Sequence, residues 1–373
     1  MTGSGAQGNS EERRVRTIAV LGTVGIPACY GGFETLCENI ARYHQANNLQ
    51  GRLVVYCSSK SYPEKTSSYL GAELRYIGLR ANGVSSVVYD ILSLLSAVRH
   101  GSEVILLLGV SGAAVLPLIR LLSKARIVTN IDGIEWKREK WKGLARWFLR
   151  FSERVAVRFS DEVIADNEGI ARHVTDTYGR DCAVIAYGGD HAFIAPARPY
   201  EDEALPPGYA LALCRIEPEN NVAMILEAFA KNMEMPLVFV GNWHSSPFGQ
   251  ALRKRYDGVR HLRLLDPIYD SGVLRTIRGN AALYVHGHSA GGTNPSLVEM
   301  MHFAIPILAY DCIFNRFSTE DKALFFNSAN ELRSIVDALT STTSHEVGTE
   351  MRLIAQRRYT WEAIGREYFR VIG

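Results

Sequence analysis

Short, almost uninterrupted apolar runs alternate with longer amphipathic segments along most of the chain. Runs rich in leucine and β-branched residues are typical of strands buried on both faces of a parallel sheet. In the first half they are Thr17–Gly22, Leu53–Cys57, Glu103–Gly109, Arg126–Asn130 and Glu162–Asp166. The amphipathic segments predict helices, for example at Ser85–Arg99, Ser111–Ser123 and Leu144–Phe159. The alternation predicts a doubly wound α/β domain.

The rhythm breaks between Asp190 and Gly208, where four prolines and three consecutive acidic residues occur. This segment predicts a linker at residues 191–207, between an N-terminal domain at 17–190 and a C-terminal domain at 208–355. Apolar runs then resume, at Tyr209–Cys214, Leu237–Gly241, His261–Leu265, Ala281–Val285 and Pro306–Ala309. The second half therefore predicts another α/β domain.

The two ends of the chain differ from these domains. Residues 1–16 are rich in glycine, serine and charge, and we expect a disordered leader there. Residues 356–373 continue a helical pattern that carries Trp361, Tyr368 and Phe369. Because such aromatic side chains bury large apolar surfaces, this last segment is expected to dock on the folded part of the protein.

Composition narrows the class of protein. With 47% hydrophobic and 21% charged residues and a net charge of +2 over 373 residues, the chain reads as globular, and its charge does not indicate a polyanionic partner. No apolar stretch approaches the about 18 residues of a membrane-spanning helix. The six cysteines are scattered without a CxxC pair, which favours a reducing compartment and no disulfide framework.

Two Rossmann-like halves joined by a hinge place the carboxyl ends of two sets of strands on either side of a cleft, where doubly wound sheets bind nucleotide-type ligands. A glycine-rich loop follows the first predicted strand, with glycines at Gly22, Gly25, Gly31 and Gly32. Glycines let backbone N–H groups approach an anion or a sugar closely, and the next helix begins there. A long strand-to-helix turn explains the same pattern, and the spacing matches neither the dinucleotide fingerprint nor a Walker loop.

Arg215 ends the first strand of the second half, and Asn220 follows five residues later. An arginine at this position suits bidentate binding of a diphosphate, while a surface ion pair with Glu217 or Glu219 is the alternative.

A second polar loop follows the strand that ends near Val285. It contains His288, Gly291, Gly292, Thr293 and Asn294 ahead of a predicted helix that carries Glu299. Pro295 suits the first turn of that helix, and the loop could cradle phosphate and ribose or simply cap the helix. His286 and His288 lack an evident third ligand, so no metal site is predicted.

Two more segments carry candidate chemistry. Asp132 and Glu135 follow the strand that ends at Asn130, where carboxylates serve either acid–base work or the capping of the next helix. Residues 136–159 then hold eight basic and two acidic residues among tryptophans and other apolar side chains. Such a helix is a candidate for an anionic membrane surface, with a solvated basic face as the alternative. Its proposed membrane contacts are Trp141, Lys142, Arg146, Trp147 and Arg150. No recognised module supports nucleic-acid binding.

Together, the segments Gly22–Glu34, Asn130–Trp141, Arg215–Asn221 and His286–Glu299 resemble glycosyltransferase family 4, and most closely a rhamnosyltransferase-like branch. The resemblance covers nearly all of the chain after residue 16. It implies the GT-B fold, which consists of two Rossmann-like domains facing across a cleft, with a last helix that crosses back to the first domain. It also implies a retaining transferase that uses a nucleotide-sugar donor and requires no metal.

The resemblance assigns roles to residues. Arg215 would bind the donor diphosphate and stabilise the leaving group, with Glu299 on the nucleotide ribose and the remaining residues of the two glycine-rich loops around the donor. Asp132 would orient the acceptor hydroxyl, with Tyr30 and Glu135 as further acceptor contacts. The implied donor is dTDP-L-rhamnose. The implied acceptor is a polyprenyl-diphosphate-linked saccharide at the cytoplasmic face of the cell membrane, to which the protein would bind peripherally.

Two positions depart from the family pattern. Asn220 stands where a lysine is usual, and Gly291 stands where a glutamate normally contacts the donor sugar. The alternatives are therefore a transferase with a UDP-sugar donor, a nucleotide-sugar epimerase, and a non-catalytic sugar- or membrane-binding protein of a polysaccharide assembly complex. A Rossmann oxidoreductase is disfavoured because the first loop lacks its fingerprint.

Overall fold

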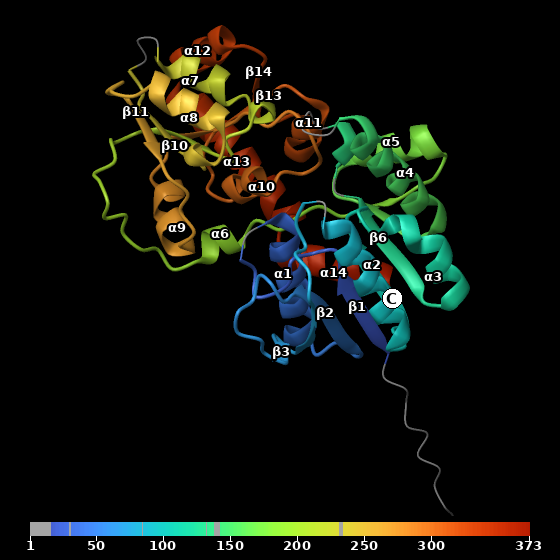
Figure 1. Ribbon diagram of the computed structural model, residues 1–373. Coiled ribbons are helices and arrows are strands. Elements are labelled where there is room, and N and C mark those ends of the chain that lie inside the picture. The colour runs from blue at the N-terminus through green and yellow to red at the C-terminus, as the bar shows by residue number, and fades with distance from the viewer. Residues whose placement is uncertain (1–15, 30, 84, 132, 138–141, 231–233) are drawn as a thin grey trace, which may run out of the picture.

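The computed structural model describes residues 16–373 apart from 30, 84, 132, 138–141 and 231–233. Two sheets divide these residues into an N-terminal and a C-terminal domain (Figure 1). The first sheet contains β1 (Thr17–Leu21), β2 (Arg52–Ser58), β3 (Ser68–Tyr69), β4 (Ala72–Ile77), β5 (Val104–Leu108), β6 (Arg126–Ile131), β7 (Glu162–Ala165) and β8 (Ala183–Val184). Its order is β3-β4-β2-β1-β5-β6-β7-β8, and all neighbours are parallel except β3 and β4.

Helices cover both faces of this sheet. They are α1 (Gly32–Ala46), α2 (Ser85–Arg99), α3 (Leu116–Leu122), α4 (Gly143–Phe159) and α5 (Glu168–Tyr178), with short 3₁₀ turns η1 (Ala113–Val115) and η2 (Glu135–Lys137). Alternate residues of β1 enter different layers: Ile18 and Val20 pack on the side of α1, and Ala19 and Leu21 pack on the side of α2 to α5. Two-sided burial is the reason why these strands are apolar throughout.

The C-terminal sheet is entirely parallel within the described residues, in the order β11-β10-β9-β12-β13-β14. Its strands are β9 (Ala210–Leu213), β10 (Leu237–Val240), β11 (Leu262–Leu265), β12 (Leu283–His286), β13 (Ile307–Tyr310) and β14 (Leu324–Phe326). Its larger helices are α7 (Val222–Ala230), α8 (Pro247–Arg255), α9 (Ser271–Gly279), α10 (Pro295–Met301), α11 (Ile313–Thr319), α12 (Ala329–Asp337) and α13 (Ser341–Arg358). The short turns are α6 (His191–Ile194), η3 (Pro218–Asn220) and η4 (Trp243–Ser245).

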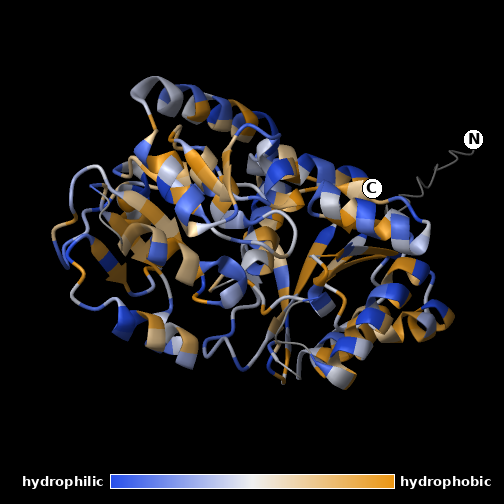
Figure 2. Cartoon of the chain, turned by 90° about the horizontal axis from the view of Figure 1, so that it is seen from above, coloured by the Kyte–Doolittle hydropathy of each residue, from blue (hydrophilic) through white to orange (hydrophobic). Residues whose placement is uncertain are grey.

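The last helix, α14 (Trp361–Ile372), returns to the N-terminal domain, where its red ribbon lies among blue elements in Figure 1. Phe369 stacks on Tyr43 of α1 with ring centroids 5.8 Å apart, and the Asn130 amide donates a hydrogen bond to the Tyr368 hydroxyl. One apolar cluster therefore runs from the first sheet through α14 into α10 and α13 of the second domain. Figure 2 shows the same arrangement, with apolar strands inside and mixed helices outside.

The structure agrees with the predicted fold class, since both halves are α/β domains built on parallel strands. Helix α2 has the predicted bounds, whereas the α-helical part of the predicted Ser111–Ser123 segment begins only at Leu116, after a 3₁₀ turn. The C-terminal helical pattern forms two helices: α13 ends at Arg358, and α14 begins at Trp361. The predicted linker contains the short helix α6.

Candidate active site

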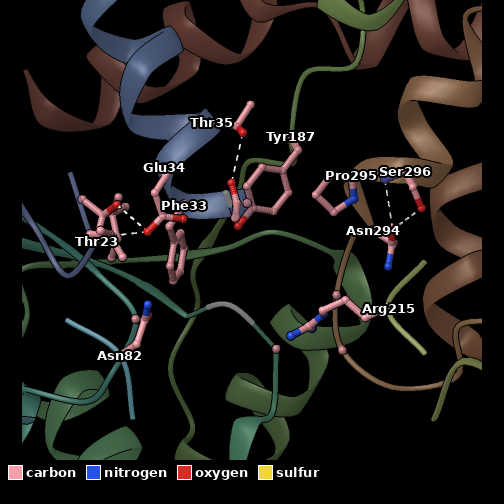
Figure 3. A pocket seen from close by; sticks show the side chains of 18 of the residues that line it. Thr23, Phe33, Glu34, Thr35, Asn82, Tyr187, Arg215, Asn294, Pro295 and Ser296 are labelled. Carbon is pink, nitrogen blue, oxygen red and sulfur yellow. Dashed lines mark hydrogen bonds between the residues drawn. The ribbon is translucent and has the colours of Figure 1, made fainter. Parts of the chain in front are cut away.

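A cavity of about 1170 Å³ lies between the two domains and is lined by the carboxyl ends of strands from both sheets. This volume exceeds the range of about 300–1000 Å³ that is typical of small-ligand pockets. In Figure 3, Thr23, Glu34 and Asn82 approach it from the N-terminal domain, and Arg215, Asn294 and Ser296 approach it from the C-terminal domain. The cavity therefore has room for two substrates side by side.

Glu34, at the start of α1, holds the first glycine-rich loop in place. Its carboxylate accepts hydrogen bonds from the Thr23 hydroxyl at 3.0 Å and from the Val24 amide at 2.8 Å (Figure 3). A Cβ atom at Gly31 would overlap this carboxylate, so the loop needs glycine at that position. The loop is thus folded back on its own helix and presents Gly22, Gly31 and Gly32 to the cavity.

Arg215 follows β9, and its side chain extends into the cavity with 42% of its surface exposed (Figure 3). Its nearest carboxylate is that of Glu217, at 3.7 Å, which is too long for a hydrogen-bonded ion pair. The guanidinium therefore remains available to an anionic ligand.

Asn220 ties the Arg215 loop to the second polar loop. Its side-chain amide donates to the Arg215 carbonyl at 2.7 Å, so its oxygen faces the Nδ1 atom of His288 at 2.6 Å. This arrangement places the imidazole proton on Nδ1 of His288. Ser289 adds two hydrogen bonds to the Glu219 carbonyl, of 2.9 Å from its amide and 2.8 Å from its hydroxyl. Asn220 therefore braces the site and supplies no charge to it.

Glu299 lies within a chain of polar contacts on the C-terminal wall. Its carboxylate pairs with Arg278 of α9 and, at 3.2 Å, with Nε2 of His191 in α6. Trp361 of α14 donates to Nδ1 of His191 at 2.9 Å, which leaves the ring proton on Nε2, facing Glu299. Burial raises the pKa of Glu299, and the charge of Arg278 and the contact with His191 lower it. The lowering effects are larger, so the pKa of Glu299 lies below its ordinary value.

Asp166 and Asn167, which follow β7 of the N-terminal domain, hold the second glycine-rich loop from across the cleft. The Asp166 carboxylate accepts from the Thr293 amide at 3.1 Å, and the Thr293 hydroxyl donates to the Asp166 carbonyl. The Asn167 amide donates to the Thr293 hydroxyl at 3.3 Å. A Cβ atom at Gly292 would overlap the Asp166 carboxylate, and a Cβ atom at Gly133 would lie 3.1 Å from the Cα atom of Gly291. The N-terminal domain therefore occupies the space beside Gly291.

Helix α4 carries the predicted membrane surface. Leu144 and Trp147 are 85% and 65% exposed, and Trp147 stacks on Phe151 with ring centroids 5.7 Å apart. The guanidinium groups of Arg146 and Arg150 lie over the Trp136 ring, 5.6 and 5.3 Å from its centroid. The neighbouring helices α2 and α3 add exposed apolar side chains at Val88, Leu92, Leu118, Leu121 and Leu122. None of the described helices is long and apolar enough to span a bilayer.

Most of the predicted site residues line the one cavity. They are Gly22, Gly31, Gly32, Glu135, Arg215, Asn220, His288, Gly291, Gly292, Thr293, Asn294 and Glu299. Gly25 does not line it, because it packs against Cys57 in the core of the N-terminal domain. Tyr30, Asp132 and Trp141 lie outside the described residues. His286 is fully buried, and burial lowers the pKa of its imidazole well below the ordinary range.

Sequence reasoning did not single out Glu34, Asp90, Asp166 or Arg278, which all contact or line the site. For Glu34 the signal was present, as the acidic end of the first loop motif. For Asp90 it was the lone carboxylate within the apolar pattern of α2. Asp166 and Arg278 gave no local signal, since their partners lie far away along the chain.

The sequence was compared with protein families, curated proteins and solved structures. A family model described as "Domain of unknown function (DUF1972)" matches residues 15–190. The comparison with curated proteins found no match.

Solved structures resemble the whole chain. Sucrose-phosphate synthase from Thermosynechococcus elongatus superposes with a TM-score of 0.77 at 15% identity, over 95% of this chain and 98% of its own. A glycosyltransferase from Rickettsia africae gives 0.73 at 11% identity, over 96% and 98%. HepE from Anabaena, in complex with UDP, gives 0.72 at 13% identity, over 96% and 99%. Similarity at these identities establishes the fold. The chain has the GT-B fold, with two Rossmann-like domains facing across a cleft, as predicted.

Proposed function

We propose that this protein is a retaining glycosyltransferase that moves a sugar from a nucleotide diphosphate to a hydroxyl of a lipid-linked saccharide. The observation that carries the proposal is Arg215, an available guanidinium just after β9 that lines, together with the two glycine-rich loops, a cavity large enough for two substrates. The GT-B fold supports it, since proteins that share this fold include a sucrose-phosphate synthase and a glycosyltransferase.

In the proposed reaction, the bond between the anomeric carbon and the diphosphate oxygen breaks, and a bond to the acceptor oxygen forms on the same face. The acceptor proton passes to the departing phosphate oxygen. Arg215 and the backbone N–H groups of the second glycine-rich loop stabilise the charge that develops there, and preorganised donors of this kind contribute strongly to catalysis. Asp132 orients the acceptor hydroxyl, Glu299 binds the ribose, and no metal is required.

The proposed donor is dTDP-L-rhamnose. The four sequence motifs support it through their resemblance to the rhamnosyltransferase-like branch of glycosyltransferase family 4. Gly291 also supports it, because a site without the usual sugar-contacting glutamate suits a sugar of another shape, such as an L-deoxyhexose. A UDP-sugar is the second candidate, and it is favoured by the similarity to HepE, whose structure contains UDP.

The proposed acceptor is a polyprenyl-diphosphate-linked saccharide, such as N-acetylglucosamine, at the cytoplasmic face of the cell membrane. Support comes from α4, where apolar and cationic side chains are exposed together, and from the apolar surfaces of α2 and α3 beside it. A helix of this kind binds at the headgroup level of anionic bilayers. Leu144, Ala145 and Phe148 of the same helix also line the cavity, so a lipid-linked substrate could reach it from this surface.

Nucleotide binding tests the proposal without an acceptor. We expect calorimetry to show dTDP binding more tightly than UDP, GDP or ADP, and Arg215→Ala to weaken that binding at least about tenfold, as expected for a charge-assisted hydrogen bond. Arg370→Ala is the matched control, because Arg370 is exposed on α14 and pairs only with Glu367 within the described structure. Selective UDP binding would keep the enzyme class and replace the donor. Binding of none of the four would favour the non-catalytic alternative.

A further inference from the structure

Asp90 of α2 is a buried carboxyl on the N-terminal wall of the cavity. Only 5% of its surface is exposed, and it lines the cavity beside the first glycine-rich loop. The neighbouring Tyr89 fixes this part of the helix, because its hydroxyl donates to the carbonyls of Thr23 and Tyr56 at 3.1 and 3.0 Å. On its other side, Asp90 touches Gly112, where a Cβ atom would overlap the Asp90 side chain. The position of the carboxyl is therefore set by rigid neighbours.

The carboxyl differs from the other buried acids of the molecule. Four acidic side chains are buried among the described residues: Glu34, Asp90, Glu153 and Asp166. Glu34 accepts from Thr23 and Val24, Glu153 accepts from Trp136, His173 and Tyr178, and Asp166 accepts from Thr293. No hydrogen bond or ion pair joins Asp90 to any residue in the described part of the chain. Burying an acid without a partner is costly, so such groups in native proteins call for a reason.

The surroundings of Asp90 suit an uncharged, hydroxylated ring. The segment before α2 contributes Asn82 and Gly83 to the cavity, the first turn of α2 contributes Ser86, and the loop after β5 contributes Val110 and Ser111. These side chains are small or neutral, so they leave space and offer weak hydrogen bonds. Among the described residues, the cationic side chains of the cavity, Arg215 and Arg278, both belong to the C-terminal domain. The anionic diphosphate therefore belongs at that wall, and a neutral ring belongs at Asp90.

We propose that Asp90 binds a ring hydroxyl of the acceptor saccharide and so positions the attacking sugar against the donor. This inference rests on the proposed transferase function and adds a residue to its acceptor site. A carboxyl group accepts from one or two hydroxyls, and saccharides present pairs of hydroxyls that match it. Acceptor binding supplies the partner that Asp90 lacks.

The test compares Asp90→Asn and Asp90→Leu with Ser93→Ala in the full chain. Ser93 is a matched control, because it is buried on the same helix, donates only to the Tyr89 carbonyl at 2.8 Å and does not line the cavity. Transfer from dTDP-L-rhamnose, or from the UDP-sugar that calorimetry selects, is measured against a synthetic polyprenyl-diphosphate-linked N-acetylglucosamine. Nucleotide affinity is measured on the same samples.

We expect kcat/KM for the acceptor to fall about tenfold in Asp90→Asn and about 100-fold in Asp90→Leu, the range for leaving one or two buried polar groups of a complex without a hydrogen bond. Nucleotide affinity is expected to stay within a factor of about two, and Ser93→Ala is expected to match the wild type. Wild-type kcat/KM in both variants would overturn the role of Asp90 alone. Parallel losses of nucleotide affinity would also overturn it, by showing a general defect. A wild-type protein that neither binds nucleotide nor transfers sugar would overturn the proposed function and this inference with it.

Discussion

The two walls of the cleft are built in opposite ways. On the C-terminal wall the polar groups are held by one another: Asn220 joins Arg215 to His288, and Glu299 lies between Arg278 and His191. The N-terminal wall contains the Asp90 carboxyl, which has no partner within the described part of the chain, and helix α4 exposes apolar side chains such as Leu144 and Trp147. Asn220, His288 and Glu299 have partners without a ligand, whereas the Asp90 carboxyl has none among the described residues.

The proposed function explains this difference by what each wall would bind. A nucleotide diphosphate has a constant shape and charge, so a preorganised network recognises it at little cost. An acceptor at a membrane surface has to be found and oriented, and groups kept for that purpose stay unsatisfied until it arrives. Functional sites are where proteins give up stability in this way.

The contact between Asp166 and Thr293 joins the two walls, and removing it has the largest expected effect. Asp166 is only 1% exposed and holds Thr293 of the second glycine-rich loop from the opposite domain. We expect Asp166→Ala to lower kcat/KM for the donor about 10- to 100-fold, because the loop loses its brace and a buried Thr293 amide loses its acceptor. Steady-state kinetics with varied nucleotide sugar measures the effect.

Asp176→Ala is the control, since Asp176 is exposed on α5 of the same domain, and we expect unchanged kinetics. Wild-type donor kinetics in Asp166→Ala would mean that the contact between the walls does not matter for the donor, and the comparison would then reduce to two independent surfaces.

The sequence predicted the braced wall better than the other one. Arg215 and His288 lie just after the ends of buried strands, and Glu299 lies in the helix that follows the second of them. These strands are visible because two-sided burial makes them apolar. Strand β4, which lies between β3 and β2, was not predicted, since its residues alternate between buried and half-buried and include Glu73 and Arg75.

Contacts between segments far apart along the chain could not be predicted from the sequence. Arg278 of α9 contacts Glu299 of α10, and Asp166 contacts Thr293 across the cleft. No spacing along the chain predicts either pair. Asp90 was detectable in principle, because a carboxylate on the buried side of an apolar helix violates the amphipathic pattern. The violation becomes meaningful only when the structure shows that none of the residues it describes pairs with Asp90.

The exposed apolar surface of the N-terminal wall predicts an intermediate effect. We expect flotation with anionic vesicles to show the wild-type protein bound. A Leu144→Ser, Trp147→Ser double variant should bind about tenfold more weakly, since it loses two exposed apolar side chains that would enter the bilayer. Leu353→Ser is the control, because Leu353 is 56% exposed but lies on α13 of the other domain. Equal binding of all three proteins, or none by the wild type, would remove the membrane from the proposed function.

The smallest expected effect is on stability, and it distinguishes a functional Asp90 from a structural one. Burial raises the pKa of Asp90 to about 8. In the unfolded chain the group titrates near its ordinary value of about 3.9, so between these values the folded protein holds a proton that the unfolded chain has released. The contribution of Asp90 to stability is therefore greatest below about pH 4 and is lost as the pH rises towards 8.

Asp90→Asn removes this loss, because an amide does not ionise. We expect the melting temperatures of the variant and the wild type to approach each other near pH 4, and the variant to melt on the order of a few degrees higher at pH 8. Thermal unfolding followed between pH 4 and pH 9 measures the difference, and Ser93→Ala should keep the wild-type pH dependence. A variant less stable than the wild type at pH 8 would show that Asp90 supports the fold. A more stable variant that transfers sugar poorly would show instead that Asp90 costs the free protein stability because the acceptor needs it.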